Sequence, residues 1–168
     1  FMKALRADLP EPALPTERSD ENVKILSPAY AGPKSEMTAV LQYVYQSILF
    51  AAGGEKEIAD TLLSIGIAEM DHLLLLGSAI EAFGAKPIYT ARPPRPFAWY
   101  SSAAVCYDSD PCRMIEADIA GERGAIADYE RMLSCLDDEA CIAIVERILA
   151  DERIHLETLK KIARSLCC

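Results

Sequence analysis

Four stretches of the chain repeat apolar residues at three- and four-residue steps, the spacing of one face of an α-helix. They run from Ser35 to the Gly53-Gly54 pair, from Glu55 to Phe83, from Asp110 to about Leu136, and from Asp137 or Asp138 through Ile162. Helix-ending glycines and a helix-opening Asp-Pro pair mark several of these limits. Short breaks inside each pair of stretches predict two antiparallel helical hairpins. The expected fold class is therefore all-α.

Two proline-rich segments lie outside these stretches. Residues 85 to 110 connect the two hairpins, and their prolines exclude a continuous helix, so we expect one long crossover. Residues 1 to 33 combine prolines with polar residues, which predicts an extended arm. The expected organisation is a proline-rich N-terminal arm at 1–33 followed by a four-helix bundle at 34–168.

Composition excludes several classes of partner. The chain has 168 residues and a formal net charge of −9, which disfavours binding to nucleic acid or to anionic membranes. Charged residues interrupt every long apolar run, so we expect no membrane span. The N-terminal residues lack the pattern of a signal peptide, which favours the cytoplasm. There, a chain with a good core is not expected to need disulfides, and the six cysteines are assigned no catalytic role; the terminal Cys167-Cys168 pair is the one left open to oxidation or to a link between subunits.

The only two histidines occupy matching motifs. Each follows a glutamate by three residues, in Glu69-Met-Asp-His72 and Glu152-Arg-Ile-His155. Residues three apart in a helix lie on the same side about one turn apart, so each pair can present a carboxylate and an imidazole to one point. The motifs lie in the second and fourth predicted helices. They are candidate metal ligands.

The first and third predicted helices each carry a glutamate among apolar neighbours, Glu36 and Glu122. An unpaired buried carboxylate costs several kcal/mol, roughly, and ligation of cations removes that cost. Tyr43 and Tyr129 follow these glutamates by seven residues, nearly two turns, so each is expected on its glutamate's side of the helix. There it would donate a hydrogen bond to a ligand or line the approach to the metals. Asp118 is expected just outside the ligand set.

One glutamate from each of two helices plus Glu-x-x-His from each of two others is the ligand set of ferritin-like di-iron and di-manganese proteins. The segment from Tyr30 to Gln46, the Glu69–His72 motif and the segment from Asp118 to Glu122 resemble manganese catalases, a branch of that superfamily. The resemblance covers roughly residues 28 to 165. It implies a ferritin-like four-helix bundle with two metal ions per chain, Mn or Fe, bound by Glu36, Glu69, His72, Glu122 and His155. Glu152 is either a bridging ligand or a carboxylate beside the ligands, and we include it in the site.

The resemblance implies an oxidoreductase that acts on hydrogen peroxide, by manganese catalase-like disproportionation or peroxidase chemistry. Two alternatives remain open: a ferritin-like iron-binding or ferroxidase protein, and a structural coat or scaffold protein that retains a metal site. The ligands suit manganese and iron alike. Prolines mixed with aromatic residues, Tyr89, Phe97, Trp99 and Tyr100, further predict that the 85–110 connection and the proline-rich arm cover the bundle or a second copy in a homo-oligomer.

Overall fold

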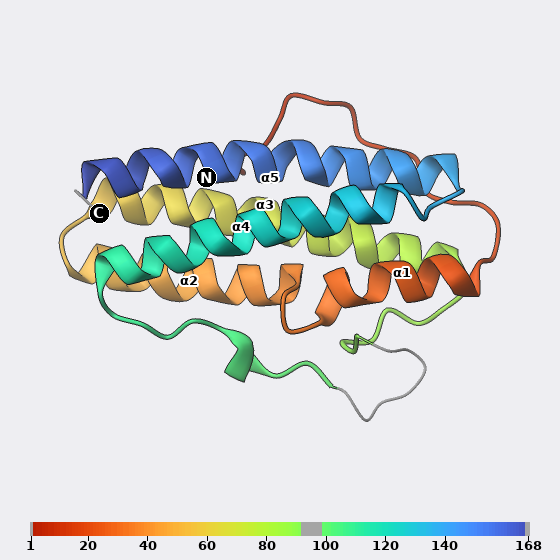
Figure 1. Ribbon diagram of the computed structural model, residues 1–168, viewed down its shortest axis with the longest axis horizontal. Helices are drawn as coiled ribbons and strands as arrows, with labels where there is room; N and C mark the ends of the chain where they lie inside the picture. Colours follow the sequence, from red (N-terminus) through yellow and green to blue (C-terminus); the bar gives the residue numbers. More distant parts are fainter. Residues whose placement is uncertain (1, 92–98, 167–168) are drawn as a thin grey trace.

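The computed structural model describes residues 2–91 and 99–166. Its α-helices are α1 (Asp20–Ala31), α2 (Glu36–Ala52), α3 (Lys56–Ala82), α4 (Pro111–Leu133) and α5 (Glu139–Ser165), and a short 3-10 helix, η2, spans Ser102–Ala104 (Figure 1). In the described residues the extended pairing is limited to an isolated bridge between Thr90 and Trp99. The predicted all-α fold is confirmed.

The two predicted hairpins are α2–α3 and α4–α5, with the long crossover between them (Figure 1). Gly54 and Gly84 adopt the left-handed conformation, with φ of 90° and 96°, at the ends of α2 and α3. Asp110 caps α4 by accepting a hydrogen bond from the Arg113 amide at 2.9 Å, and Asp138 caps α5 in the same way. Helix boundaries therefore follow local capping chemistry.

The predicted extended arm is wrong for part of its length, because residues 20 to 31 form helix α1. Ser19 caps this helix, and Pro28 lies inside it. An interior proline costs a helix roughly 3 kcal/mol. Burial of each large apolar side chain contributes about 1.5–3 kcal/mol, and α1 buries three, Val23, Leu26 and Tyr30. Tertiary burial thus outweighs the local penalty.

Helix α1 has a clear place in the bundle. Helix α2 has 17 residues, whereas α3 has 27, so α2 covers only part of its partner. Helix α1 lies end to end with α2 along the bundle and covers the remainder (Figure 1). One of the four helical positions of the bundle is therefore occupied by two consecutive helices. The non-helical residues Gly32 to Ser35 connect them.

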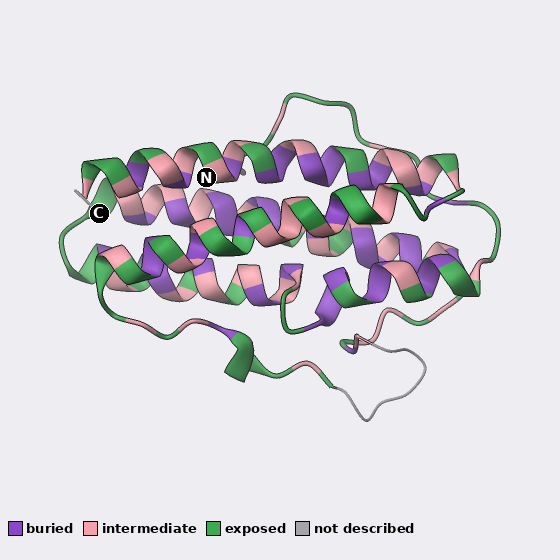
Figure 2. Ribbon diagram, viewed as in Figure 1, coloured by how far each residue is buried: buried purple, intermediate pink, exposed green. Residues whose placement is uncertain are grey.

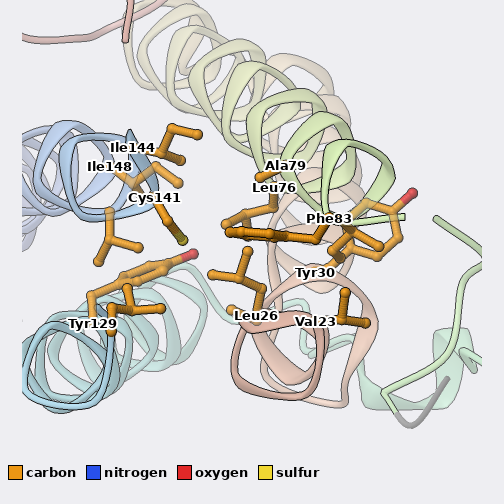
Figure 3. Close-up of a cluster of buried hydrophobic side chains, with 14 of the residues drawn as sticks. Val23, Leu26, Tyr30, Leu76, Ala79, Phe83, Tyr129, Cys141, Ile144 and Ile148 are labelled. Carbon is orange, nitrogen blue, oxygen red and sulfur yellow. The ribbon is translucent and has the colours of Figure 1, made fainter. Parts of the chain in front are cut away.

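The apolar core consists of two clusters, and buried residues line the inner sides of the α-helices (Figure 2). In the first, side chains of α1 face those of α3, α4 and α5, including Leu26, Leu76, Tyr129 and Ile148 (Figure 3). The second is built around Tyr43, Leu62, Ile115 and Leu159. Along α3, α4 and α5 the predicted ligands fall between the two clusters in sequence. The polar site is therefore enclosed by apolar layers.

Helix α3 is long and apolar enough to cross a membrane by length and composition, since an 18-residue stretch of it has a mean hydropathy of 1.4. Half of that stretch, however, is buried inside the bundle. The helix also carries Glu69 and His72. Burial of this kind is expected of a helix that contributes to the core of the bundle.

The crossover leaves Tyr89 and Trp99 exposed, at 50% and 60%, while Phe97 lies outside the described residues. Coverage of a second copy by this segment stays a prediction.

The cysteines follow expectation in part: Cys106, Cys135 and Cys141 are free, and Cys141 is buried. Cys112, however, is disulfide-bonded, which corrects the expectation that the chain does without disulfides.

Candidate metal centre

The six predicted ligands come from four helices. Glu36 lies in the first turn of α2, where the helix dipole favours a carboxylate. The others lie in the middle of α3, α4 and α5. None is more than 4% exposed: Glu36, Glu69, His72, Glu122, Glu152 and His155. The structure brings all six together, although metal binding by them remains a prediction.

Their ligand atoms form two overlapping groups. Glu36, Glu69, His72 and Glu152 offer atoms that lie within 4.8 Å of one another, and so do Glu69, Glu122, Glu152 and His155. The two imidazole rings are 5.8 Å apart between centroids. Glu69 and Glu152 belong to both groups, so each is placed to bridge two ions. The position of Glu152 thus favours a bridging ligand over a carboxylate beside the ligands.

The two histidines approach the shared glutamates through the same ring nitrogen. His72 Nδ1 is 3.1 Å from Glu69 Oε2 and 3.1 Å from Glu152 Oε1. His155 Nδ1 is 3.0 Å from Glu69 Oε1 and 3.8 Å from Glu152 Oε2. The Nδ1 atoms therefore face the centre, and the Nε2 atoms face outward.

The tyrosines connect the two halves of the site. The Tyr43 hydroxyl donates a short hydrogen bond to Glu122, and the Tyr129 hydroxyl donates one to Glu36. Each tyrosine thus reaches the glutamate of the other hairpin. The seven-residue spacing relates each tyrosine to the glutamate of its own helix, but the glutamate that accepts its hydrogen bond lies across the bundle.

Two buried acidic residues lie outside the ligand set. Asp118, expected close to the ligands, accepts hydrogen bonds from Gln42 Nε2 at 2.7 Å and Gln46 Nε2 at 2.9 Å. Asp151 was missed by the sequence reasoning. Its Oδ2 lies 3.1 Å from His72 Nε2 and 3.2 Å from Arg147 Nε. Its place directly before Glu152 and four residues after an arginine was an available signal.

Burial is the main cause of the pKa shifts of the two carboxyl groups that belong to one ligand group each, Glu36 and Glu122. It raises the pKa of Glu36 well above the usual value, and the negative charge of Glu69 adds to the shift. Burial raises the pKa of Glu122 in the same way, together with the charge of Glu152. In the metal-free chain both shifts favour the protonated form of these two carboxyl groups.

The shared carboxylates shift in the opposite direction. Burial opposes ionisation of Glu69, but the adjacent histidines hold its pKa well below the usual range. Burial and the charge of Glu69 also oppose ionisation of Glu152, yet hydrogen bonds from Glu122 and the histidines lower its pKa to about 2. Burial disfavours the His155 cation, while Glu152 and Glu69 raise its pKa to about 10. The raised pKa values of Glu36, Glu122 and His155 act against a build-up of buried negative charge, the charge that divalent ions would neutralise.

The donor set fits a metal pair. Among the described residues, Glu69 Oε1, Glu152 Oε1 and His155 Nδ1 are buried, and although each lies 3.0 or 3.1 Å from an atom of the site, none of these contacts has the geometry of a good hydrogen bond. Buried polar atoms are seldom left without partners. Here they are carboxylate oxygens and an imidazole nitrogen that face one another, as metal ligation requires. Oxygen ligands with imidazole suit both manganese and iron.

Comparison with known proteins agrees with this geometry. The model of the ferritin-like domain family matches residues 34–166. Two structures of KatB, a manganese catalase from Anabaena, are 25% identical to the chain, cover 95% of it and 80% of their own length, and have TM-scores of 0.77 and 0.80.

Bacterioferritins share the fold at lower identity. The Rhodobacter capsulatus protein is 22% identical, with a TM-score of 0.73, and the match covers 88% of this chain and 86% of that one. BfrA of Mycobacterium tuberculosis is also 22% identical, with a TM-score of 0.74 and coverage of 89% and 88%. Comparison with curated protein sequences gives no match. On the family match and the fold, this chain belongs to the ferritin-like domain family.

Proposed function

We propose that the protein binds two manganese or iron ions and disproportionates hydrogen peroxide, converting 2 H2O2 into 2 H2O and O2. The observation that carries the proposal is the pair of overlapping ligand groups that share Glu69 and Glu152. Similarity to a manganese catalase over 95% of the chain supports the choice of substrate. Two adjacent redox-active ions would supply the two electrons that one peroxide takes up and another returns.

Each residue has a role in this proposal. Glu36 and His72 would hold one ion, and Glu122 and His155 would hold the other. Glu69 and Glu152, which belong to both ligand groups, would contribute to both. The apolar clusters on either side exclude bulk water, which strengthens these electrostatic contacts.

The tyrosines orient the outer carboxylates. Tyr43 donates to Glu122 Oε1 and Tyr129 donates to Glu36 Oε1, so a hydroxyl holds one oxygen of each carboxylate, and Glu36 Oε2 faces the centre 3.4 Å from His72 Nδ1. Their hydroxyl protons are also the nearest donors to those carboxylates. We assign both residues to the site as orienting groups and candidate proton donors to the substrate.

The first experiment measures metal content and turnover together. Protein purified without chelator is analysed for Mn and Fe, and oxygen release from peroxide is followed with an oxygen electrode. We expect about two ions per chain and one O2 for every two H2O2 consumed. Protein that binds neither metal under oxidising or reducing conditions would contradict the proposal.

The same ligand set also fits a ferroxidase, in which O2 accepts electrons from Fe(II). That function consumes oxygen when Fe(II) is added and releases none from peroxide, so the oxygen electrode separates the two. A structural role would show neither reaction, but chelation would still lower the melting temperature.

A homo-oligomer in the cytoplasm completes the proposal. Exposed apolar side chains on α2 and α3 and on the crossover support an interface between copies. They include Leu41, Val44, Ile48, Met70, Leu74, Tyr89 and Trp99. Burial of the apolar window of α3 inside the bundle supports a water-soluble protein.

A further inference from the structure

The first residues of the chain run along α3 and α5 and contact the groups behind both histidines. We define residues 5 to 9 as the N-terminal strap. The Leu5 amide donates to the Ser64 carbonyl of α3 at 2.9 Å. The Arg147 guanidinium of α5 donates to the carbonyls of Ala7 and Leu9, both at 3.0 Å. The strap therefore ties the two Glu-x-x-His helices together.

Two strap peptide groups reach the metal centre. His155 Nε2 lies 2.7 Å from the Leu5 carbonyl oxygen, so it carries the proton and donates. The Ala7 amide donates to Asp151 Oδ1 at 2.6 Å, and Asp151 Oδ2 accepts from His72 Nε2 at 3.1 Å. In both histidines Nε2 is thereby occupied, which leaves Nδ1 free for the centre.

The two motifs differ at one position, and the strap compensates for the difference. Asp151 precedes Glu152 and supports the histidine of the other motif, His72. The matching position before Glu69 is Ala68, which is fully buried and offers no acceptor. The Leu5 carbonyl accepts the hydrogen bond of His155 Nε2, as a carboxylate at position 68 would if it corresponded to Asp151.

We propose that the N-terminal strap is a positioning element of the metal centre, which orients His155 directly through the Leu5 carbonyl and His72 through Asp151. This inference rests on the proposed two-metal site. A neutral carbonyl accepts more weakly than a carboxylate, so the two ion positions are unequal, and the one at His155 is the weaker. Release of the strap weakens both positions.

The test uses full-length protein and Mn(II) as the probe. Leu5→Pro combined with Ala7→Pro removes the two amide donors that anchor the strap. Free and bound Mn(II) are distinguished by EPR during titration. We expect the dissociation constants to rise about 10- to 100-fold, the range observed when partners behind metal ligands are lost. Asp8→Pro is the matched control, since the Asp8 amide makes no hydrogen bond in the described chain.

A third variant separates positioning from loosening of the fold. Ala68→Asp, added to the strap variant, places a carboxylate in the position that corresponds to Asp151 and is expected to restore the affinity of one ion only. Circular dichroism of the metal-free proteins checks that all variants fold. A strap variant that is unfolded without metal is replaced by Ala7→Pro alone, for which weaker binding is again expected.

The outcomes are distinguishable from failure of the proposed function. If wild type binds no Mn or Fe, the two-metal site itself is wrong. If wild type binds two ions and the strap variant binds both with the same affinity, the site stands and the positioning role is overturned. Failure of Ala68→Asp to restore any affinity would likewise overturn it.

Discussion

Glu69 and Glu36 differ in the number of ligand groups to which they belong, and this difference predicts how much metal is lost when each is removed. Glu69 belongs to both ligand groups, whereas Glu36 belongs to one. A residue shared by two ions holds each of them, so its removal weakens both sites. Comparison of these two glutamates therefore tests the bridging arrangement.

We expect Glu69→Ala to lower metal content from about two ions per chain to one or fewer and to abolish peroxide turnover. Glu36→Ala is expected to retain one ion, because the group that contains Glu122 and His155 stays complete. Elemental analysis after dialysis measures both contents. Equal metal loss in the two variants would contradict a bridging role for Glu69.

Asp118 provides a pH-dependent test at a site apart from the ligands. Burial raises its pKa from 3.8 to about 7, against the hydrogen bonds from Gln42 and Gln46. The folded chain thus holds this proton more tightly than the unfolded chain. Stability that the proton contributes is complete below about pH 4 and is lost as pH rises through about 7.

We expect the free energy of unfolding of metal-free Asp118→Asn to exceed that of wild type by an amount that grows between pH 4.5 and pH 8. Three pH units correspond to at most about 4 kcal/mol. Urea denaturation at each pH measures the difference. Glu116→Gln, at an exposed position of the same helix, is the control. A difference that does not change with pH would show that Asp118 ionises normally in the fold.

At the scale of the elements, the close approach of α2 to α3 depends on Gly66. A Cβ atom added there would lie 3.2 Å from Tyr43 Cβ, which is rigidly attached to α2. The same Tyr43 donates to Glu122 across the bundle. Through Tyr43, the packing of α2 against α3 affects the position of a candidate ligand, Glu122.

Gly66→Ala is expected to lower the melting temperature, because overpacking costs about 1–3 kcal/mol and exceeds the helix-propensity gain of about 1 kcal/mol. Gly124→Ala in α4 meets no atom within 4 Å and is expected to raise it. Thermal unfolding of the chelated proteins measures both shifts. If the two alanines shift the melting temperature alike, the close helix contact has no energetic role.

At the scale of the whole molecule, several large apolar side chains of the α2–α3 hairpin are exposed. Ile48 is 62% exposed and Leu74 69%, with Leu41, Val44 and Met70 also exposed. Exposed apolar side chains of this size favour association. A second copy of the chain would cover them.

We expect wild type to sediment as a homo-oligomer and the Ile48→Glu/Leu74→Glu protein to shift toward monomer, since two charges would have to be buried on association. Ala120→Glu, at an exposed position of α4, is the control and is expected to keep the wild-type mass. Analytical ultracentrifugation at micromolar concentration measures the change. A monomeric wild type would contradict the homo-oligomer, and an unchanged double variant would place the interface elsewhere.

The sequence by itself determined the four long helices, the two hairpins, the crossover and the six candidate ligands. These features depend on local chemistry. Apolar periodicity and capping residues act over a few positions, and a Glu-x-x-His spacing places two ligands on one side of any helix that contains it.

Only the tertiary structure decided the features that depend on contacts between distant segments. Helix α1 forms despite Pro28 because α3 leaves an apolar surface for it to cover. Tyr43 and Tyr129 reach the opposite hairpins, and the Leu5 carbonyl meets His155 across 150 positions of sequence. No local pattern encodes such pairings, since they follow from how the folded helices bring remote groups within hydrogen-bonding distance.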